Sequence, residues 1–265
     1  MEAVVSAAFE PRSPGRQPGQ GRVVVIMPAR NSALTLEATV HGIPAGVVDQ
    51  IVLVDNASKD DTVAIAERLG LTVVRHPVDR GFGGSVKRLF HEALAAGADF
   101  VVELHPDNQY DPASLPALIQ EMGDHRHAMV IASRFLPTSR RALDGGMPWW
   151  KFGANRLLTF MNNAMMGVWL SEYHSGFRIY SARWARTAPW AAFSDDFKLG
   201  FQLIAQAVIE GYTLGEVPGF CRYFAEASQN PLGGSLKYGW GTLTESFRVL
   251  RYRLGITSAR NPRTE

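Results

Sequence analysis

The sequence predicts an α/β protein with a mostly parallel central sheet and helices on both faces of that sheet. Short, continuous apolar runs recur along the chain, which is typical of strands that are buried on both sides. These runs alternate with segments of helical pattern, and that order produces a parallel sheet. The chain has 265 residues, of which 46% are hydrophobic and 20% are charged, so one large domain can bury a substantial core.

The first half of the chain supplies five strands that are separated by helices. We predict strands over Val23–Met27, Ile51–Asp55, Leu71–Arg75, Phe100–Leu104 and Met129–Ser133. We predict helices over 34–40, 58–69, 81–96 and 115–122. Ser58, Asp60 and Asp61 suit the start of the second helix, because their oxygens accept from free N–H groups and their charge complements the helix dipole.

The second half of the chain has a different pattern. A loop over 136–150 is followed by predicted helices over 150–168, 199–210 and 235–253, with one strand over Thr213–Val217. We expect this C-terminal helical region to pack against the first half and not to form an independent domain. The Pro-, Gly- and Arg-rich run over 11–22 has no apolar periodicity, which is typical of a flexible arm.

Composition excludes several classes of protein. The formal charge is +2, from 27 basic and 25 acidic residues, which is too balanced for a protein whose main partner is nucleic acid. The single cysteine, Cys221, excludes disulfide frameworks and cysteine-based zinc sites, and it fits a reducing cytoplasmic location. The sequence contains no apolar run long enough to predict a transmembrane helix, and the nearest, over 157–170, contains two asparagines.

Polar side chains directly follow most of the predicted strands. They are Asn31, Asp55, Asn56, His105, Asp107, Gln109 and Arg134. Ligands of open parallel sheets bind beyond the carboxyl ends of the strands, so we expect these side chains to share one rim. Carboxylate, amide and guanidinium groups suit a phosphorylated ligand together with a divalent metal.

A dinucleotide-binding protein is the main competing interpretation, and the sequence argues against it. Such a protein needs G-x-G-x-x-G directly after the first strand. Here that turn reads Pro28-Ala29-Arg30-Asn31 and has no glycine, whereas the Gly-rich segment 81–84 follows the third strand. The sequence also has no Walker A loop.

The ordered motifs resemble the family-two glycosyltransferases of GT-A fold. They are PARNSALTLE from Pro28, IVLVDNASKDDT from Ile51, the Gly-rich helix start and HPDNQYDP from His105. In the second half SRF, HSGFR and EVPGFCRY resemble the dolichol-phosphate mannose synthase branch. The resemblance covers about 22–243. It implies one GT-A catalytic domain over 22–255, with a nucleotide-sugar-binding half (22–135), an acceptor-side half (136–255), a flexible arm (1–21) and a flexible tail (256–265).

The resemblance also implies which residues bind the nucleotide sugar. They are Pro28, Ala29, Asn31, Asp55, Asn56, Gly83, His105 and Asp107. The Asp55 carboxylate would accept a hydrogen bond from the N–H of uracil or guanine, so both UDP- and GDP-sugars stay open. Alternatively, Asp55 only caps the turn that follows it.

A metal motif with two aspartates is expected in this family, and the chain departs from it. His105-Pro106-Asp107 replaces the pair, so Asp107 would match the second aspartate and Gln109 a later glutamine. We expect Mg²⁺ or Mn²⁺ at Asp107, Gln109 and His105, because Mg²⁺ needs only one or two protein carboxylates besides phosphates and water, while a histidine suits Mn²⁺. Alternatively, His105 contacts ribose or phosphate and no metal.

Charged residues of the second half are the remaining candidates. Arg134, Arg178 and Arg222 each match an arginine of the branch and could clamp the donor diphosphate or an anionic acceptor, or else form structural ion pairs. Asp195 and Asp196 could serve as a general base or an acceptor contact, or could cap a helix. We take Asp107, Arg178, Asp195 and Asp196 as the candidate catalytic residues.

Two features leave the acceptor side open. Glu172 and His174 stand where the branch often has aspartate and threonine. The methionines over 161–166, with Trp149, Trp150 and Trp169, belong either to the core or to an interfacial helix that rests on a membrane.

We therefore expect a metal-dependent inverting glycosyltransferase that uses a nucleotide-diphosphate sugar and a polyprenyl phosphate. A phosphate monoester has a second pKa of roughly 6 and needs no deprotonation. The hydroxyl of a soluble metabolite would need a carboxylate base. A non-catalytic nucleotide-sugar-binding protein and a nucleotidyltransferase are the alternatives. We expect a cytoplasmic protein with peripheral membrane contact if the acceptor is a lipid, while the sugar, the base and the oligomeric state stay open.

Overall fold

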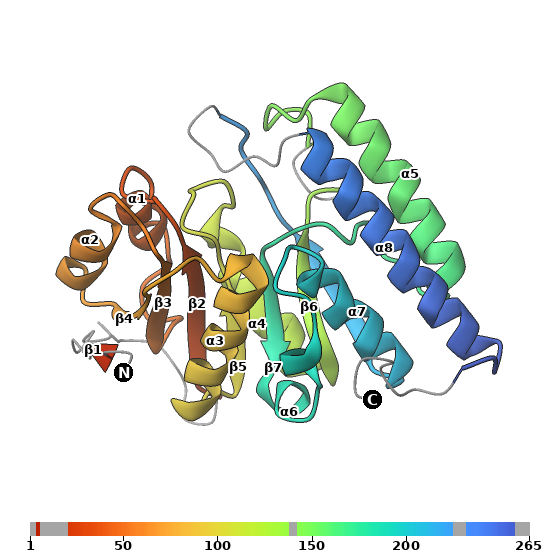
Figure 1. Cartoon of the computed structure of the whole chain (residues 1–265), viewed down its shortest axis with the longest axis horizontal. Helices are drawn as coiled ribbons and strands as arrows, with labels where there is room; N and C mark the ends of the chain where they lie inside the picture. Colours follow the sequence, from red (N-terminus) through yellow and green to blue (C-terminus); the bar gives the residue numbers. More distant parts are fainter. Residues whose placement is uncertain (1–3, 6–20, 138–141, 225–231, 258–265) are drawn as a thin grey trace.

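The structure is a computed structural model that describes residues 4–5, 21–137, 142–224 and 232–257 (Figure 1). Within these residues a sheet has the strand order β1-β4-β3-β2-β5-β7-β6-β8. Its strands are β1 (Val4–Val5), β2 (Val23–Ala29), β3 (Gln50–Asn56), β4 (Thr72–His76), β5 (Phe100–Glu103), β6 (His127–Ser133), β7 (Arg178–Ser181) and β8 (Thr213–Pro218). Only β1 and β7 run against the others, so the predicted mostly parallel sheet is confirmed.

Helices cover both faces of the sheet and enclose two hydrophobic cores. They are α1 (Leu36–His41), α2 (Thr62–Arg68), α3 (Gly81–Ala95), α4 (Leu115–Asp124), α5 (Trp149–Met166), α6 (Ala182–Ala185), α7 (Leu199–Ile209) and α8 (Leu232–Arg253). Ile26 of β2 joins the core that contains side chains of α3 and α7, whereas Met27 joins the core that contains side chains of α1 and α4. Because successive side chains of a strand point to opposite faces, a fully apolar strand such as β2 supplies both cores.

Strand β7 is the main departure from the predicted order. It lies between β5 and β6 and pairs antiparallel with both, so Arg178 stands opposite Glu103 on one side and Ile131 on the other. The run RIYS is only four residues long, which is too short for periodicity to identify it as a strand. Because β7 runs antiparallel, its first residue, Arg178, lies at the edge where β5 and β6 end.

Helices α5 and α8 lie alongside each other at the end of the molecule farthest from β1 (Figure 1). The Ser246 hydroxyl donates to Asn162 Oδ1 at 2.9 Å and joins the two helices. Helix α5 ends at Gly167, whose φ of 69° is the left-handed conformation that glycine adopts without strain. In the part of the chain that the structure describes, the helices are all too short or too polar to cross a membrane.

The domain boundaries stay predictions. Strands β7 and β8 of the predicted acceptor-side half pair with β5 and β6 of the other half, so one sheet runs through both. The predicted arm falls mostly on 1–3 and 6–20, and the tail mostly on 258–265, and these residues lie outside the described part of the chain.

Candidate active site

The turns that follow β2, β3 and β4 are tied into one polar rim at the carboxyl edge of the sheet. The Asn31 N–H donates to Ser58 Oγ at 2.9 Å, and Asn31 Oδ1 accepts from the Lys59 N–H at 2.9 Å. The Asn56 amide donates to Asp79 Oδ1 at 2.6 Å. The structure thus brings together the predicted residues of the first two turns, where Pro28 and Ala29 end β2.

Asp55 has a structural role in this rim. Its buried carboxylate accepts from the Ser58 N–H, with both oxygens at 3.3 Å from the nitrogen. This contact is the turn cap that the sequence left as one alternative. A carboxylate offers about four lone-pair positions, so the cap leaves capacity for a nucleotide base.

The glycines at the start of α3 allow a second chain segment to approach closely. A Cβ at Gly83 would lie 2.4 Å from the carbonyl oxygen of Ser194, and the Gly83 N–H donates to the carbonyl oxygen of Asp195 at 2.8 Å. Gly81 adopts a φ of 73°, and its N–H donates to Asp79 Oδ1 at 2.8 Å. That bond holds the pKa of Asp79 below its usual value, although burial opposes the shift.

Both aspartates of the 194–196 segment already have partners. Lys87 Nζ lies 2.8 Å from Asp195 Oδ1. Asp196 Oδ1 accepts from the Ser194 hydroxyl and from the Lys198 N–H, each at 2.9 Å, just before α7. Asp196 therefore closes the turn that precedes α7, but it does not cap the helix itself, whose N-cap is Lys198 without a side-chain cap bond.

The turn after β5 is held against α1. The Thr35 hydroxyl donates to the Pro106 carbonyl at 2.7 Å, and the Asn108 N–H donates to Thr39 Oγ1 at 3.0 Å. The buried Asp107 carboxylate accepts from the Gln109 N–H at 3.1 Å through Oδ1. Asp107 and Gln109 thus lie together in one largely buried turn after β5.

His105 is fixed by Glu103, a buried acid that was not among the predicted site residues. Its Nε2 lies 3.3 Å from Glu103 Oε1, and the Tyr180 hydroxyl donates to Glu103 Oε2 at 2.7 Å. Burial opposes protonation of His105, but the hydrogen bond and charge of Glu103 outweigh it and raise the pKa of the imidazole. This arrangement leaves Nδ1 of His105 for a ligand, and it fits either predicted role of His105.

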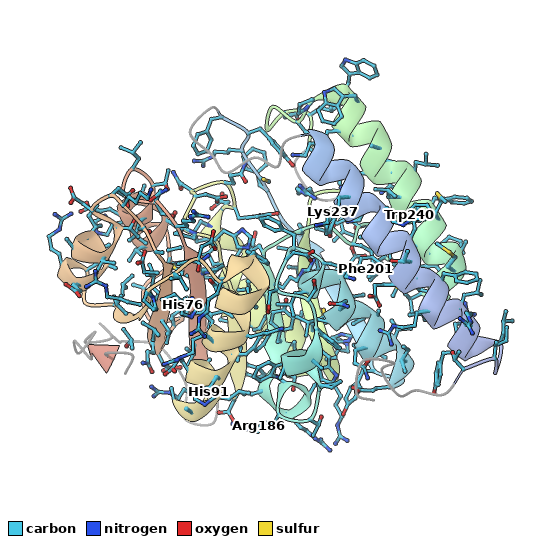
Figure 2. The ribbon with its side chains drawn as sticks, in the orientation of Figure 1. His76, His91, Arg186, Phe201, Lys237 and Trp240 are labelled. Atoms are coloured by element: carbon cyan, nitrogen blue, oxygen red, sulfur yellow. The ribbon has the colours of Figure 1, made fainter. Side chains whose placement is uncertain are left out.

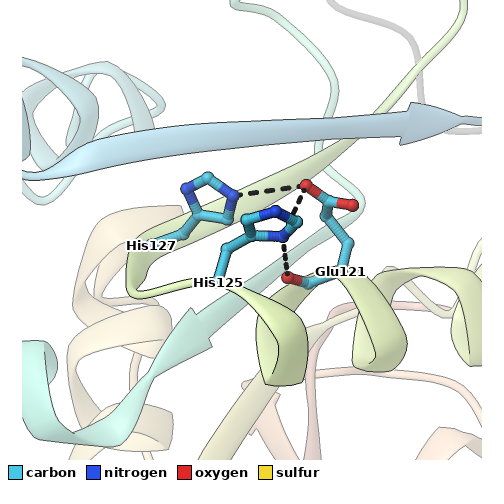
Figure 3. Close-up of side chains that lie close together, drawn as sticks. All are labelled: Glu121, His125 and His127. Carbon is cyan, nitrogen blue, oxygen red and sulfur yellow. Dashed lines mark hydrogen bonds and ion pairs between the residues drawn. The ribbon is translucent and has the colours of Figure 1, made fainter.

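A metal ion at Asp107 would have few protein ligands. Within the described residues, the one set of three acidic, His or Cys side chains whose ligand atoms lie within 4.8 Å of one another is elsewhere. It consists of Glu121 on α4, His125 just after that helix and His127 at the start of β6, so it lies near the opposite end of β6 from Arg134 (Figure 3). Asp107 with Gln109 or His105 fits Mg²⁺ or Mn²⁺ only if donor phosphates and water complete the coordination, as Mg²⁺ sites commonly require.

Arg134 forms a buried ion pair. Its Nε lies 3.0 Å from Glu172 Oε1, its Nη2 donates to Glu172 Oε2, and its Nη1 donates to the Tyr223 hydroxyl at 2.5 Å. Burial alone would lower the pKa of Arg134, but the charge of Glu172 outweighs it and raises that pKa. This is the structural pairing that the sequence left as the alternative to phosphate binding.

The other two arginines differ in exposure. The buried Arg178 uses Nε, Nη1 and Nη2 to donate to the carbonyl oxygens of Ser175, Gly200 and Tyr173 at 2.7 to 3.0 Å. It therefore holds the turn over 174–176, which we call the HSG turn, against the start of α7. Arg222 is exposed, and its N–H donates to the Gln109 carbonyl at 2.8 Å. The structure therefore places Arg222 beside the Asp107 turn, and its guanidinium faces solvent.

His174 is held neutral beside these arginines. Its Nδ1 lies 3.2 Å from the Tyr238 hydroxyl, and its buried Nε2 has no partner among the described residues. Burial and the charges of Arg134 and Arg178 lower the pKa of His174 to about 3.

Because His174 stays neutral in the folded protein, we expect the free energy of unfolding to fall in acid. The unfolded chain binds a proton at His174 below a pKa of about 6.5, while the folded chain does not until about 3, so stability falls as pH falls through this window. From pH 7 to about pH 5 we expect the wild type to lose about 2 kcal/mol more than His174→Asn. Urea unfolding at both pH values measures this difference, and equal losses in the two proteins would contradict it.

Several residues of the rim were not identified from the sequence. Glu103, Asp79 and Lys87 contact predicted site residues. Only Glu103 carries a signal, because an acid inside the apolar run FVVEL must be paired when that strand is buried. The partners of Asp79 and Lys87 come from segments distant in the sequence, and no local pattern marks them.

The fold and this edge define the class of protein. A mostly parallel sheet, polar turns without a glycine loop after β2, and the Asp107 turn after β5 are the arrangement of a GT-A glycosyltransferase. The chain belongs to glycosyl transferase family 2, whose family model matches residues 24–187.

Named relatives and solved structures agree with this family. The chain is 25% identical to the polyprenol monophosphomannose synthase of Mycolicibacterium smegmatis, over 74% of this chain and 76% of that protein. It is 24% identical to the UDP-N-acetylglucosamine–dolichyl-phosphate N-acetylglucosaminyltransferase of Methanococcus voltae, over 60% and 69%. The glucosyl-3-phosphoglycerate synthase of Mycobacterium tuberculosis, solved with Mn²⁺, UDP-glucose and phosphoglyceric acid, shares the fold with a TM-score of 0.62 and 19% identity, over 93% and 87%.

Proposed function

We propose that this glycosyltransferase is an inverting, metal-dependent enzyme that transfers a sugar from a nucleotide-diphosphate sugar to a polyprenyl phosphate. In an inverting transfer the acceptor oxygen attacks C1 of the sugar from the face opposite the nucleotide diphosphate. The reaction then needs charge stabilisation on the leaving group, and a base only if the acceptor is a hydroxyl.

The choice of a phosphate acceptor rests on the contacts that the two candidate bases, Asp195 and Asp196, already make. Asp195 is paired with Lys87, and Asp196 caps the turn before α7. A phosphate acceptor needs neither, because it is already largely dianionic at neutral pH. The exposed Arg222, which adjoins the Asp107 turn, suits such an anion.

We assign the remaining roles as follows. Asp107, with Gln109 or His105, would hold Mg²⁺ or Mn²⁺, and the bound ion would offset negative charge on the leaving diphosphate. The donor would be held by Pro28, Ala29, Asn31, Asp55, Asn56, Gly83 and His105. Arg178 would act by fixing the HSG turn, and Arg134 by fixing Glu172.

The relatives support this choice of acceptor. Two of them are named for transfer to dolichyl phosphate or for synthesis of a polyprenol monophosphomannose. An acceptor of that kind lies in a membrane, so we propose that the chain works as a peripheral protein on the cytoplasmic side.

Transfer assays with both acceptor classes test the proposal. We expect UDP- or GDP-sugars with Mn²⁺ or Mg²⁺ to yield a polyprenyl-phosphate sugar. We also expect Asp195→Asn and Asp196→Asn to change its rate by less than about threefold, whereas loss of a true general base costs roughly 100- to 10,000-fold.

Lys87→Gln is the matched control, because it breaks the same ion pair and leaves Asp195 in place. Transfer only to a soluble hydroxyl acceptor, together with a large loss in Asp195→Asn but not in Lys87→Gln, would replace our proposal with the base-dependent alternative. Donor binding without any transfer would favour a non-catalytic protein.

A further inference from the structure

Helix α5 has the reverse of the polarity expected of a surface helix, because its buried side chains are mostly polar and many of its exposed side chains are apolar. Its buried positions include Asn155, Thr159, Asn162 and Asn163. Its outward positions include Trp149, Leu157, Phe160 and Met161, and Phe160 is 63% exposed. A surface helix in water normally shows the opposite pattern, with polar residues outside. The helix therefore has the pattern of an element whose outer face meets an apolar environment.

Helix α8 continues this face. Its exposed large apolar side chains are Trp240 and Phe247, and Trp240 is 71% exposed. Figure 2 shows Trp240 on α8 close to Lys237, at the end of the molecule formed by α5 and α8. Leu254, Ile256 and Trp169 follow the two helices and are exposed as well. We call the exposed apolar side chains of α5, α8 and these flanking residues the α5–α8 face.

The two helices that carry the α5–α8 face have an excess of positive charge. Helices α5 and α8 contain six basic residues and one acidic residue, whereas the whole chain has a net charge of only +2. The acidic residue, Glu245, is buried and pairs with Arg248 at 2.9 Å. Lys237, Arg251 and Arg253 are exposed. Tryptophan and basic side chains around an apolar surface are the composition of a membrane-interface helix.

The two helices that carry the α5–α8 face contact the acceptor side of the candidate active site through their inward side chains. Tyr238 of α8 contacts His174, whose turn is held by Arg178. Lys151 of α5 lies 4.9 Å from the ring centre of Tyr223, which accepts from Arg134. A surface that binds the α5–α8 face would therefore be separated from the predicted acceptor side only by these two helices.

We propose that the α5–α8 face docks on an anionic lipid bilayer and thereby brings the acceptor side of the site near the bilayer. This inference deepens the proposed function and rests on it for the reason why a bilayer would be the partner. One or two apolar side chains would bind a bilayer only weakly, but several large ones together with basic residues give stable peripheral binding.

A second copy of this chain is the main alternative occupant, and charge argues against it. A twofold dimer places the same patch of each subunit against itself. The two basic helix pairs would then face each other, and like charges across an interface are repulsive. An anionic bilayer has the opposite charge and also accepts the tryptophans.

Vesicle co-sedimentation tests the docking without donor or acceptor. We expect the full chain to sediment with phosphatidylcholine vesicles that contain phosphatidylglycerol, and less so with pure phosphatidylcholine or at high salt. The double variant Phe160→Ser, Trp240→Ser should bind at least tenfold more weakly, since it removes two large apolar side chains from the surface that the lipid would cover. The matched control is Leu34→Ser, Val78→Ser, which removes two exposed apolar side chains on the donor side and should bind as the wild type does.

The outcomes separate this inference from the proposed function. Circular dichroism and thermal melting check that both double variants are folded. Wild-type protein that does not sediment with anionic vesicles, or a dimer that the Phe160→Ser, Trp240→Ser variant converts to monomer, would overturn the docking. In either case, transfer to a short-chain polyprenyl phosphate in detergent would leave the function intact. Vesicle binding without transfer to any polyprenyl phosphate would refute the function and not the docking surface.

Discussion

Replacing Asp107 with asparagine should lower sugar transfer by roughly 100- to 10,000-fold, because the metal ion that we propose at Asp107 would supply several kcal/mol of stabilisation to the charge that develops in the transition state. The substitution keeps the size of the side chain and removes the only carboxylate in the His105–Gln109 turn. The buried position of Asp107 and its anchored turn make it the best-placed hard ligand after β5. Initial rates over a range of Mn²⁺ and Mg²⁺ concentrations measure the effect.

The control is Asp111→Asn in the same motif. Asp111 Oδ1 accepts from the Ala113 N–H at 3.0 Å and caps the short helix that precedes α4, so its loss should affect stability and not the metal requirement. If Asp107→Asn keeps wild-type rates at every metal concentration, Asp107 does not hold a catalytic ion. If metal at high concentration restores the rate in Asp107→Asn, the ion is bound there through the remaining ligands.

The fold could be predicted from local patterns because its strands are buried on both faces. Continuous runs such as Val23–Met27 and Ile51–Asp55 are visible without knowledge of their neighbours, and β2 and β3 contain them. Strand β7 could not be predicted, since its four residues become a strand only through pairing with β5 and β6. Tertiary context, and not local propensity, decides such short segments.

The candidate site was predictable in its turns and not in its ion pairs. Order along the chain places the turns after β2, β3 and β5 at one edge, because parallel strands share that edge. The sequence could not show that Arg134 contacts Glu172, since the two lie 38 residues apart and their pairing depends on the position of β7. It likewise gave no sign that the indole of Trp240 faces outward, because helical spacing alone does not tell a core face from a membrane face.

The Arg134–Glu172 pair gives the largest effect that we expect on stability. Glu172→Gln should lower the free energy of unfolding by about 3 to 5 kcal/mol, because it leaves the buried guanidinium of Arg134 without its counter-charge. The double variant Arg134→Met, Glu172→Leu should be more stable than Glu172→Gln alone, since it removes both buried charges. Urea unfolding at neutral pH compares the wild type with both variants.

The surface pair of Arg68 and Glu37 is the matched control, because both side chains are well exposed and their nitrogen and oxygen lie 2.8 Å apart. Glu37→Gln should cost no more than about 1 kcal/mol. A similarly small cost for Glu172→Gln would mean that Arg134 does not depend on Glu172 and is held for an anionic ligand. In that case phosphate should stabilise Glu172→Gln more than the wild type, because ligand binding to the folded state raises its stability by mass action. A large cost that phosphate does not offset would assign Arg134 to the framework of the acceptor side and leave Arg222 as the arginine that meets the acceptor.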